Sequence, residues 1–319
     1  VQHGLKARRA GFVRGRDVRQ QAEAPAVEDS NAAQRAGGEI AHRRRQHAER
    51  NLHVAAEQIV HQRRGALVRH QHGFDAFRYD VYRKANIYLQ EDTNSYRRPL
   101  VQHVYTDPID IFDRHLYERG SVVLDMLRTE LGDELWWKAI HHYVTQHRAS
   151  DVLTHDLQRA IEQATGRNMD AFFQQWVWKG GHPEFKATWA WDGATKLGTL
   201  TLTQTQKPDD LTSIYRVPLE IGFMVNGVFE RQTVRVTDAA HAFVFRLAAE
   251  PAFVAIDPAG RVLKTLDYAP GERALAARLT GDPEAVGRIE AAKGLAKVGS
   301  PGAIEALRVA LRNRREIEF

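Results

Sequence analysis

The sequence contains no cysteine among its 319 residues. Disulfide scaffolds, thiolate zinc sites, iron–sulfur clusters and cysteine nucleophiles are therefore excluded. No run of about 18 apolar residues occurs, and the first residues lack the apolar stretch of a signal peptide, so we expect no membrane span. The absence of cysteine and of a leader is compatible with a cytoplasmic protein. The chain opens at Val1 rather than Met, which suggests a fragment.

Tryptophan, tyrosine and methionine are missing from residues 1–75. This segment holds 13 Arg and one Lys against 8 acidic residues, a net charge of +6, whereas the remaining residues carry −1. The basic excess therefore does not indicate a nucleic-acid-binding protein as a whole. Three interpretations of the segment stay open: a disordered basic arm, a poorly packed helical appendage, and a shifted reading frame in a GC-rich gene.

Residues 76–182 are predicted to form a helical lobe. Four helices are expected, over residues 115–130, 134–147, 156–165 and 168–179. Leu116, Val123 and Leu127 recur at helical spacing in the first of them. Ser150, Asp151 and Thr154 are candidate N-caps of the third helix, and glycines end the successive segments.

Residues 183–268 change to a period of two, which predicts strands. Asp192-Gly193 and Asn226-Gly227 are typical of two-residue hairpin turns. About seven short strands in this segment favour a β-sandwich.

Residues 269–319 are predicted to be helical again. Two amphipathic helices are joined by residues 298–302, and Ala291 and Leu295 on one helix are expected to pack against Ile304, Leu307 and Leu311 on the other. This resembles a HEAT-type repeat cut short. The predicted fold class is therefore α+β and multidomain: a helical lobe, a β-sandwich and the start of a HEAT-like domain.

A set of short motifs extends through the lobe into the sandwich. They are Tyr117-Glu118-Arg119-Gly120, Met126-Leu127, Leu131-Gly132, Phe172-Phe173, Trp176 and Gly181-His182-Pro183. This order closely resembles the M1 family of zinc aminopeptidases, the gluzincins related to aminopeptidase N and leukotriene A4 hydrolase. The resemblance covers about residues 76–268 and implies the C-terminal lobe of a thermolysin-like peptidase domain. Arg119 stands where the family usually has lysine.

The resemblance implies hydrolysis of peptides by a zinc-bound water, with a glutamate as general base. It also implies that Tyr117 donates a hydrogen bond to the oxyanion of the tetrahedral intermediate. Alternatively, Tyr117 is an aromatic residue that only packs at the start of a helix.

The zinc motif of the family, H-E-x-x-H, occurs nowhere in the sequence. Family spacing would place it, and the third ligand glutamate, at about positions 30 to 60. That window lies inside the aberrant segment, so we favour a shifted reading frame there. We expect no zinc to bind this chain through the family motif.

No other side chains make a persuasive site. His53, Glu57 and His61 have helical ligand spacing, but their surroundings are basic and offer no carboxylate near each histidine to orient its ring. His141, His142 and His147 are interpreted as solvated or core-edge residues. His103, His155 and His182 are isolated, with no ligand-spaced partner nearby. No nucleophile elbow or phosphate loop is present, and neither Glu118 nor Asp209-Asp210 has an evident partner. The Trp136-Trp137 and Trp176/Trp178 pairs are read as core and rim aromatics.

The sequence thus predicts part of an M1-type zinc aminopeptidase, inactive as written, whose intact relatives act on peptides. The alternative is a non-catalytic M1-like scaffold that binds protein or nucleic-acid partners. A nucleic-acid partner is the less favoured of these, and the oligomeric state stays open.

Overall fold

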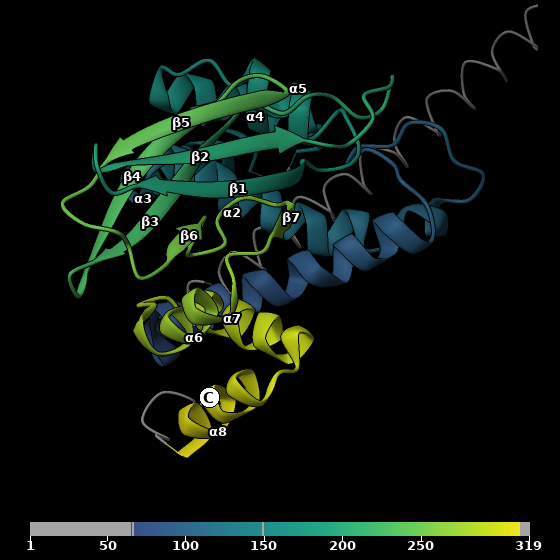
Figure 1. Ribbon diagram of the computed structural model, residues 1–319. Coiled ribbons are helices and arrows are strands. Elements are labelled where there is room, and N and C mark those ends of the chain that lie inside the picture. Colours follow the sequence, from purple (N-terminus) through teal and green to yellow (C-terminus); the bar gives the residue numbers. More distant parts are fainter. Residues whose placement is uncertain (1–64, 66, 149, 313–319) are drawn as a thin grey trace, which may run out of the picture. The chain divides into compact units, whose positions relative to one another are not determined.

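A computed structural model of the chain describes residues 65, 67–148 and 150–312 (Figure 1). A long helix over residues 67–94 comes first, so the expected boundary between residues 75 and 76 falls inside a helix. Phe77, Val81 and Tyr88 are buried on one side of it. This spacing is that of a single apolar face directed to a core.

The helical lobe consists of this helix and the short helical elements that follow. They are η1 (Pro108–Ile111), the π-helical turn η2 (His115–Arg119), α2 (Gly120–Leu131), α3 (Asp133–Gln146), α4 (Thr154–Thr165) and α5 (Asp170–Trp176). The helices expected from the sequence are present, but α5 ends three residues earlier than its pattern suggested. Gly132, with φ of +81°, ends α2 in a backbone conformation that favours glycine.

The N-cap expected for α4 is wrong. Leu153 occupies the cap position, and its N–H donates to Asp156 Oδ2 over 2.8 Å. The Asp156 carboxylate, in the first turn, thus accepts from the backbone N–H of the cap residue, which would otherwise be left to water.

The sandwich is built from seven strands within the described residues. They are β1 (Glu184–Asp192), β2 (Leu197–Gln204), β3 (Val217–Val225), β4 (Val228–Val236), β5 (Ala240–Arg246), β6 (Val254–Ile256) and β7 (Thr265–Tyr268). One sheet has the order β5-β2-β1-β7 and the other β4-β3-β6. Asn226 and Gly227, with φ of 51° and 80°, form the predicted tight turn between β3 and β4. β7 pairs with β1 in parallel.

The two sheets share one apolar core. Leu200 of β2 and Ile221 of β3 are fully buried, and the rings of Phe223 and Phe245, from opposite sheets, lie 4.8 Å apart. Buried residues recur at every second position along much of β1, β2 and β3, so the period of two in the sequence was the correct signal for these strands.

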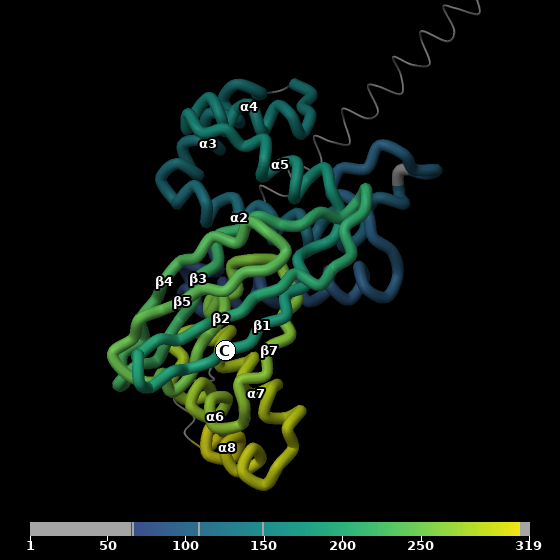
Figure 2. The backbone as a smooth tube through the Cα atoms, turned by 45° about the horizontal axis from the view of Figure 1, so that its top comes forward, coloured from purple at the N-terminus to yellow at the C-terminus, as the bar shows by residue number. Residues whose placement is uncertain are grey.

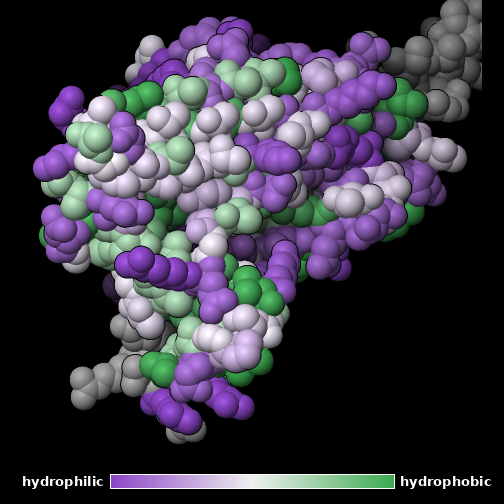
Figure 3. All heavy atoms as spheres, viewed as in Figure 1, coloured by the Kyte–Doolittle hydropathy of each residue, from purple (hydrophilic) through white to green (hydrophobic). Residues whose placement is uncertain are grey.

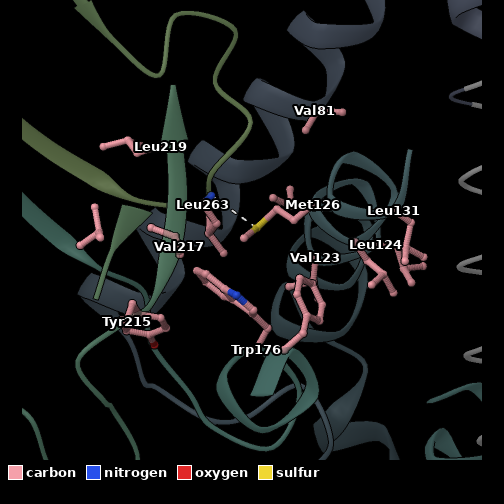
Figure 4. Packing of buried hydrophobic residues seen from close by; sticks show 14 of the residues in the cluster. Val81, Val123, Leu124, Met126, Leu131, Trp176, Tyr215, Val217, Leu219 and Leu263 are labelled. Atoms are coloured by element: carbon pink, nitrogen blue, oxygen red, sulfur yellow. Dashed lines mark hydrogen bonds between the residues drawn. The ribbon is translucent and has the colours of Figure 1, made fainter. Parts of the chain in front are cut away.

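The lobe and the sandwich meet around Trp176. Figure 4 shows its indole between α2, which carries Val123 and Met126, and β3, which carries Val217. The ring of Trp176 lies 4.9 Å from that of Tyr215, and both are buried. Because Trp176, the last residue of α5, is buried between the lobe and the sandwich, its packing joins the two parts.

The last three helices of the described residues, α6 (Glu272–Gly281), α7 (Ala285–Val298) and α8 (Pro301–Arg312), pack on one another (Figure 2). Leu295 of α7 and Ala303 of α8 are buried between them. The expected pairing of Ile304 and Leu311 with α7 is wrong, because these side chains are 44% and 65% exposed. Leu307, also expected from the sequence, does pack against this cluster, together with Ala303, Ala306 and Ala310.

Within the part of the chain described, no helix is both long and apolar enough to cross a bilayer. On the face seen in Figure 3, hydrophobic residues are interspersed with hydrophilic ones rather than gathered into one band.

Candidate functional site

Tyr117 lies in the π-helical turn η2, directly before α2. Its side chain is half-buried, its backbone N–H donates to Asp113 O over 3.1 Å, and its ring centre lies 6.2 Å from that of Phe112. π-Helical turns are rare, and where they occur they are frequently at functional sites. The local backbone therefore marks the same residue that the motif does, although it does not assign Tyr117 a role.

Carboxylates hold the turn to neighbouring segments. Asp113 Oδ1 accepts from the backbone N–H of Leu116 (3.0 Å). The guanidinium of Arg98 reaches both oxygens of Asp113, with Nη2–Oδ1 at 2.5 Å and Nε–Oδ2 at 2.8 Å. Glu91 Oε1, at the end of the long helix, accepts from Arg114 N over 3.2 Å. The turn is thus fixed at its first residues by charge-assisted hydrogen bonds.

His115 is fully buried beneath this turn. Its Nδ1 lies 3.4 Å from Glu91 Oε1 and 3.5 Å from Asp113 Oδ2, and its Nε2 lies 3.6 Å from Asp92 Oδ1. These are ion-pair distances rather than well-formed hydrogen bonds, so the attraction is mainly coulombic.

Asp92 is the second centre of the same buried group. It accepts hydrogen bonds from Tyr88 Oη (3.0 Å) and Arg97 Nε (3.0 Å), and it lies 3.2 Å from His182 Nδ1. His182 had seemed isolated in the sequence, but the fold places it against a carboxylate. We call His115 and the groups around it the His115 cluster: Tyr88, Glu91, Asp92, Tyr96, Arg97, Arg98, Asp113, His115 and His182.

The cluster shifts the ionisation of its members. Burial raises the pKa of Asp92, but the close approach of His115, His182 and Arg97 outweighs it, and the pKa lies well below its ordinary range. For Asp113, burial is likewise outweighed by His115 and Arg98, and its pKa is lowered. Burial lowers the pKa of His115, yet Asp113 and Asp92 prevail and raise it. Burial, and to a smaller extent Asp113, raise the pKa of Tyr96 to about 12.

Arg119, the departure from the family lysine, is fully buried. Nη1 donates to Arg98 O (3.1 Å), and Nη2 donates to Lys179 O (3.0 Å) and Gly181 O (3.2 Å). The guanidinium also lies 5.5 Å from the centre of the Tyr88 ring. One side chain thus connects the Tyr117 turn to the segment that enters β1.

Replacing Arg119 by lysine is expected to lower the free energy of unfolding by about 1–3 kcal/mol, because one ammonium cannot reach all three carbonyls in this geometry. Urea denaturation followed by tryptophan fluorescence measures the change. Arg159→Lys, at a side chain that is 67% exposed, is the matched control and should leave the midpoint in place. Equal midpoints for both variants would show that the carbonyl contacts contribute nothing.

The other histidines considered in the sequence lie elsewhere. His103 and His155 stack on Trp178, with ring centres 6.3 and 4.6 Å from it. A cavity of about 570 Å³ beside His155 is lined by polar side chains of α4 and α5. His142 Nε2 lies 3.1 Å from Gln163 Oε1 at the surface. His53, Glu57 and His61 lie outside the described residues.

The remaining sequence candidates are also accounted for. Trp136 and Trp176 are core residues, as expected, whereas Trp137 is exposed. Glu118 does have a partner, since its Oε1 accepts from Arg114 Nη1 over 2.8 Å. Asp209 accepts from the backbone N–H groups of Leu211 and Thr212, so it caps its own loop.

Among the described residues, one group of three, Glu91, Asp113 and His115, has potential ligand atoms within 4.8 Å of one another. It does not fit a catalytic zinc. Both oxygens of Asp113 already accept from Arg98, and Oδ2 also accepts from Tyr96 Oη. A zinc site needs free lone pairs, a neutral imidazole and an open position for water.

The helical lobe is the part of the chain that is similar to a known peptidase family. Residues 67–176, which include the long helix, the Tyr117 turn and α5, match the model of the Peptidase family M1 domain. The chain is also similar to several aminopeptidases, and together these matches support an M1 aminopeptidase family.

Three relatives illustrate the similarity. Probable aminopeptidase 1 of Sulfurisphaera tokodaii is 28% identical over 157 residues, which cover 48% of this chain and 19% of that protein. Aminopeptidase N of Lactococcus lactis subsp. lactis is 30% identical over 114 residues (34% and 13%). Aminopeptidase M1-A of Oryza sativa subsp. japonica is 33% identical over 107 residues (33% and 11%). The chain spans about a fifth or less of the length of these relatives.

A crystal structure of Legionella pneumophila aminopeptidase A in complex with aspartic acid has a similar fold. The TM-score is 0.59 at 18% identity, and the match covers 73% of this chain and 28% of the other. At this identity the likeness concerns the fold alone.

Proposed function

We propose that this chain is a portion of an M1-type zinc aminopeptidase. It would supply the helical lobe with the oxyanion donor Tyr117, the β-sandwich, and the start of a HEAT-like helical domain formed by α6–α8. The observation that carries the proposal is the M1 domain match over residues 67–176, which contains the π-helical turn with Tyr117. Intact relatives of this kind would remove N-terminal residues from peptides.

We further propose that the chain as written does not catalyse this reaction. No H-E-x-x-H is present in the sequence, and in the one candidate ligand group of the described residues both oxygens of Asp113 already accept from Arg98, with Oδ2 also accepting from Tyr96. Tyr117 could still be presented correctly, because the turn that carries it is held by Asp113 and Glu91 without a metal.

Metal analysis and a hydrolysis assay test this proposal on the purified chain. After incubation with zinc and gel filtration, we expect far less than one zinc per chain and no hydrolysis of an aminoacyl-anilide above the rate in buffer. One tightly bound zinc together with turnover would contradict it.

The nucleotide sequence provides a separate test of the family proposal. The bases that encode residues 1–75 should contain H-E-x-x-H and the ligand glutamate in another frame. A chain with that segment restored should bind one zinc and hydrolyse the anilide. Absence of the motif from all frames would instead favour the second candidate, a non-catalytic M1-like scaffold. In that case, salt-sensitive binding to DNA that disappears when residues 1–75 are removed would identify its partner.

A further inference from the structure

The carboxylates of the His115 cluster outnumber its guanidinium groups. Three carboxylates, Glu91, Asp92 and Asp113, surround the ring, and two guanidinium groups pair with them. The guanidiniums belong to Arg97 and Arg98. The guanidiniums thus leave one negative charge to be met by an imidazole, because a buried uncompensated carboxylate is costly. His182 faces Asp92 alone, at 3.2 Å, whereas His115 faces all three carboxylates.

The geometry around the ring suits a cation. The ring of Tyr96 stacks on that of His115 at 5.0 Å with an interplanar angle of 18°, and Tyr88 contacts it edge-on at 5.2 Å. An aromatic face within about 6 Å stabilises a positive charge. Both ring nitrogens lie 3.4–3.6 Å from carboxylate oxygens, so each can carry a proton toward an acceptor.

We infer that His115 is an imidazolium in the folded chain and that its charge, by holding Glu91, Asp92 and Asp113 together, positions Tyr117 in the π-helical turn. The inference deepens the proposed function, on which the catalytic meaning of Tyr117 rests. His115 is a positioning residue, since it acts on Tyr117 only through the turn.

The connection from His115 to Tyr117 is short. Asp113 faces the imidazole, accepts from Leu116 N through its side chain, and accepts from Tyr117 N through its carbonyl oxygen. Glu91 faces the same ring and accepts from Arg114 N. When His115 loses its proton, the two carboxylates that fix the turn repel each other across a neutral ring, so the turn is expected to shift.

The sign of the pH dependence follows from the pKa directions. Since the pKa of His115 is raised on folding, its stabilisation is complete below about 6.5, the ordinary value, and is lost as pH rises through the folded-state value. The pKa values of Asp92 and Asp113 are lowered, so their stabilisation is present above about 3.9 and is lost as pH falls toward their folded-state values. Burial raises the pKa values of Tyr88 and Tyr96, and, against the effect of burial, Asp92 raises that of Arg97, so these three groups keep their charge states across the interval between. His115 therefore controls the alkaline side.

An NMR titration of the full chain, labelled at histidine rings and at the tyrosine Cζ, tests the inference without zinc or substrate. We expect the His115 ring to lose its proton with a midpoint above about 6.5, and the Tyr117 signal to shift with the same midpoint. The assignments come from His115→Gln and Tyr117→Phe. In His115→Gln the Tyr117 signal should stay at its high-pH position at every pH, whereas His141→Gln, at an exposed site on α3, should titrate like the unmodified chain.

A midpoint at or below about 6.5, or a Tyr117 signal that ignores His115, would overturn the inference. If His115→Gln does not fold, Glu91→Gln decides, because removing one facing carboxylate should lower the midpoint. These readouts are independent of catalysis. If the chain proves not to derive from an M1 aminopeptidase, these NMR results are still expected. If His115 titrates with an ordinary pKa, the proposed M1 relationship is unaffected.

Discussion

Tyr117→Phe, placed in a form of the protein that carries the missing zinc ligands, is expected to lower kcat by more than tenfold and up to about 10³-fold. In the proposed function the phenol O–H donates to the oxyanion that develops in the transition state, and phenylalanine keeps the ring but removes this donor. Since the bond is made mainly in the transition state, KM should change little. Steady-state hydrolysis of an aminoacyl-anilide gives both constants, and zinc analysis should show unchanged metal content.

The matched control is Tyr82→Phe. Tyr82 lies on the long helix and hydrogen bonds to Glu290 and Lys293 of α7 rather than to the turn. Its loss should leave kcat in place. Full activity of Tyr117→Phe would remove Tyr117 from the mechanism, and equal losses in both variants would indicate damage to the fold.

Local patterns predicted most of the secondary structure. The alternation in β3 and the Asn226-Gly227 turn gave the β3–β4 hairpin correctly, since strand period and turn chemistry act within a few residues. The helices of the lobe followed from apolar spacing and glycine ends. By contrast, β6 and β7 have three and four residues, too few to show a period, and the parallel pairing of β7 with β1 joins segments far apart in sequence.

Helix phase explains the error in the tail. Leu307 and Ala303 face the neighbouring helices, and Ile304 and Leu311 point to the outside of α8. In a sequence rich in both alanine and leucine, an apolar stripe can be drawn on more than one face. Only the packing of α6 and α7 selects the alanine side.

The Tyr117 motif was visible in the sequence, but the His115 cluster was not. Its members come from the end of the long helix, the segment after it, the turn, and His182, up to 94 positions apart. Charged residues in this number are ordinary on a surface, so nothing in the sequence signals that these are buried together. The adjacent pair Arg97-Arg98 before Pro99, with Asp113 following, was the nearest available hint.

Replacing Arg78 by methionine is expected to destabilise the chain by about 3–5 kcal/mol, because it leaves Asp125 buried without its partner. Arg78 Nη1 lies 2.5 Å from Asp125 Oδ2, and both side chains are 3–4% exposed. Its Nε also donates to Ala259 O (2.9 Å), and its Nη2 to Gly260 O (2.5 Å). One guanidinium thus joins the long helix, α2 and the loop after β6.

A double-mutant cycle separates these contributions. Arg78→Met with Asp125→Leu removes both charges, so the cost should fall to about 1–3 kcal/mol, the penalty for carbonyls left without donors. The pair Arg69 and Asp133, with side chains 41% and 54% exposed, is the control, and its loss should cost about 0–1 kcal/mol. Chemical denaturation of Arg78→Met, Asp125→Leu, the double variant and the unmodified chain measures the coupling energy, and Arg69→Met is measured beside them. If Arg78→Met costs no more than Arg69→Met, the buried pair does not fasten the lobe to the sandwich, and other contacts, such as those around Trp176 and Arg119, must do so.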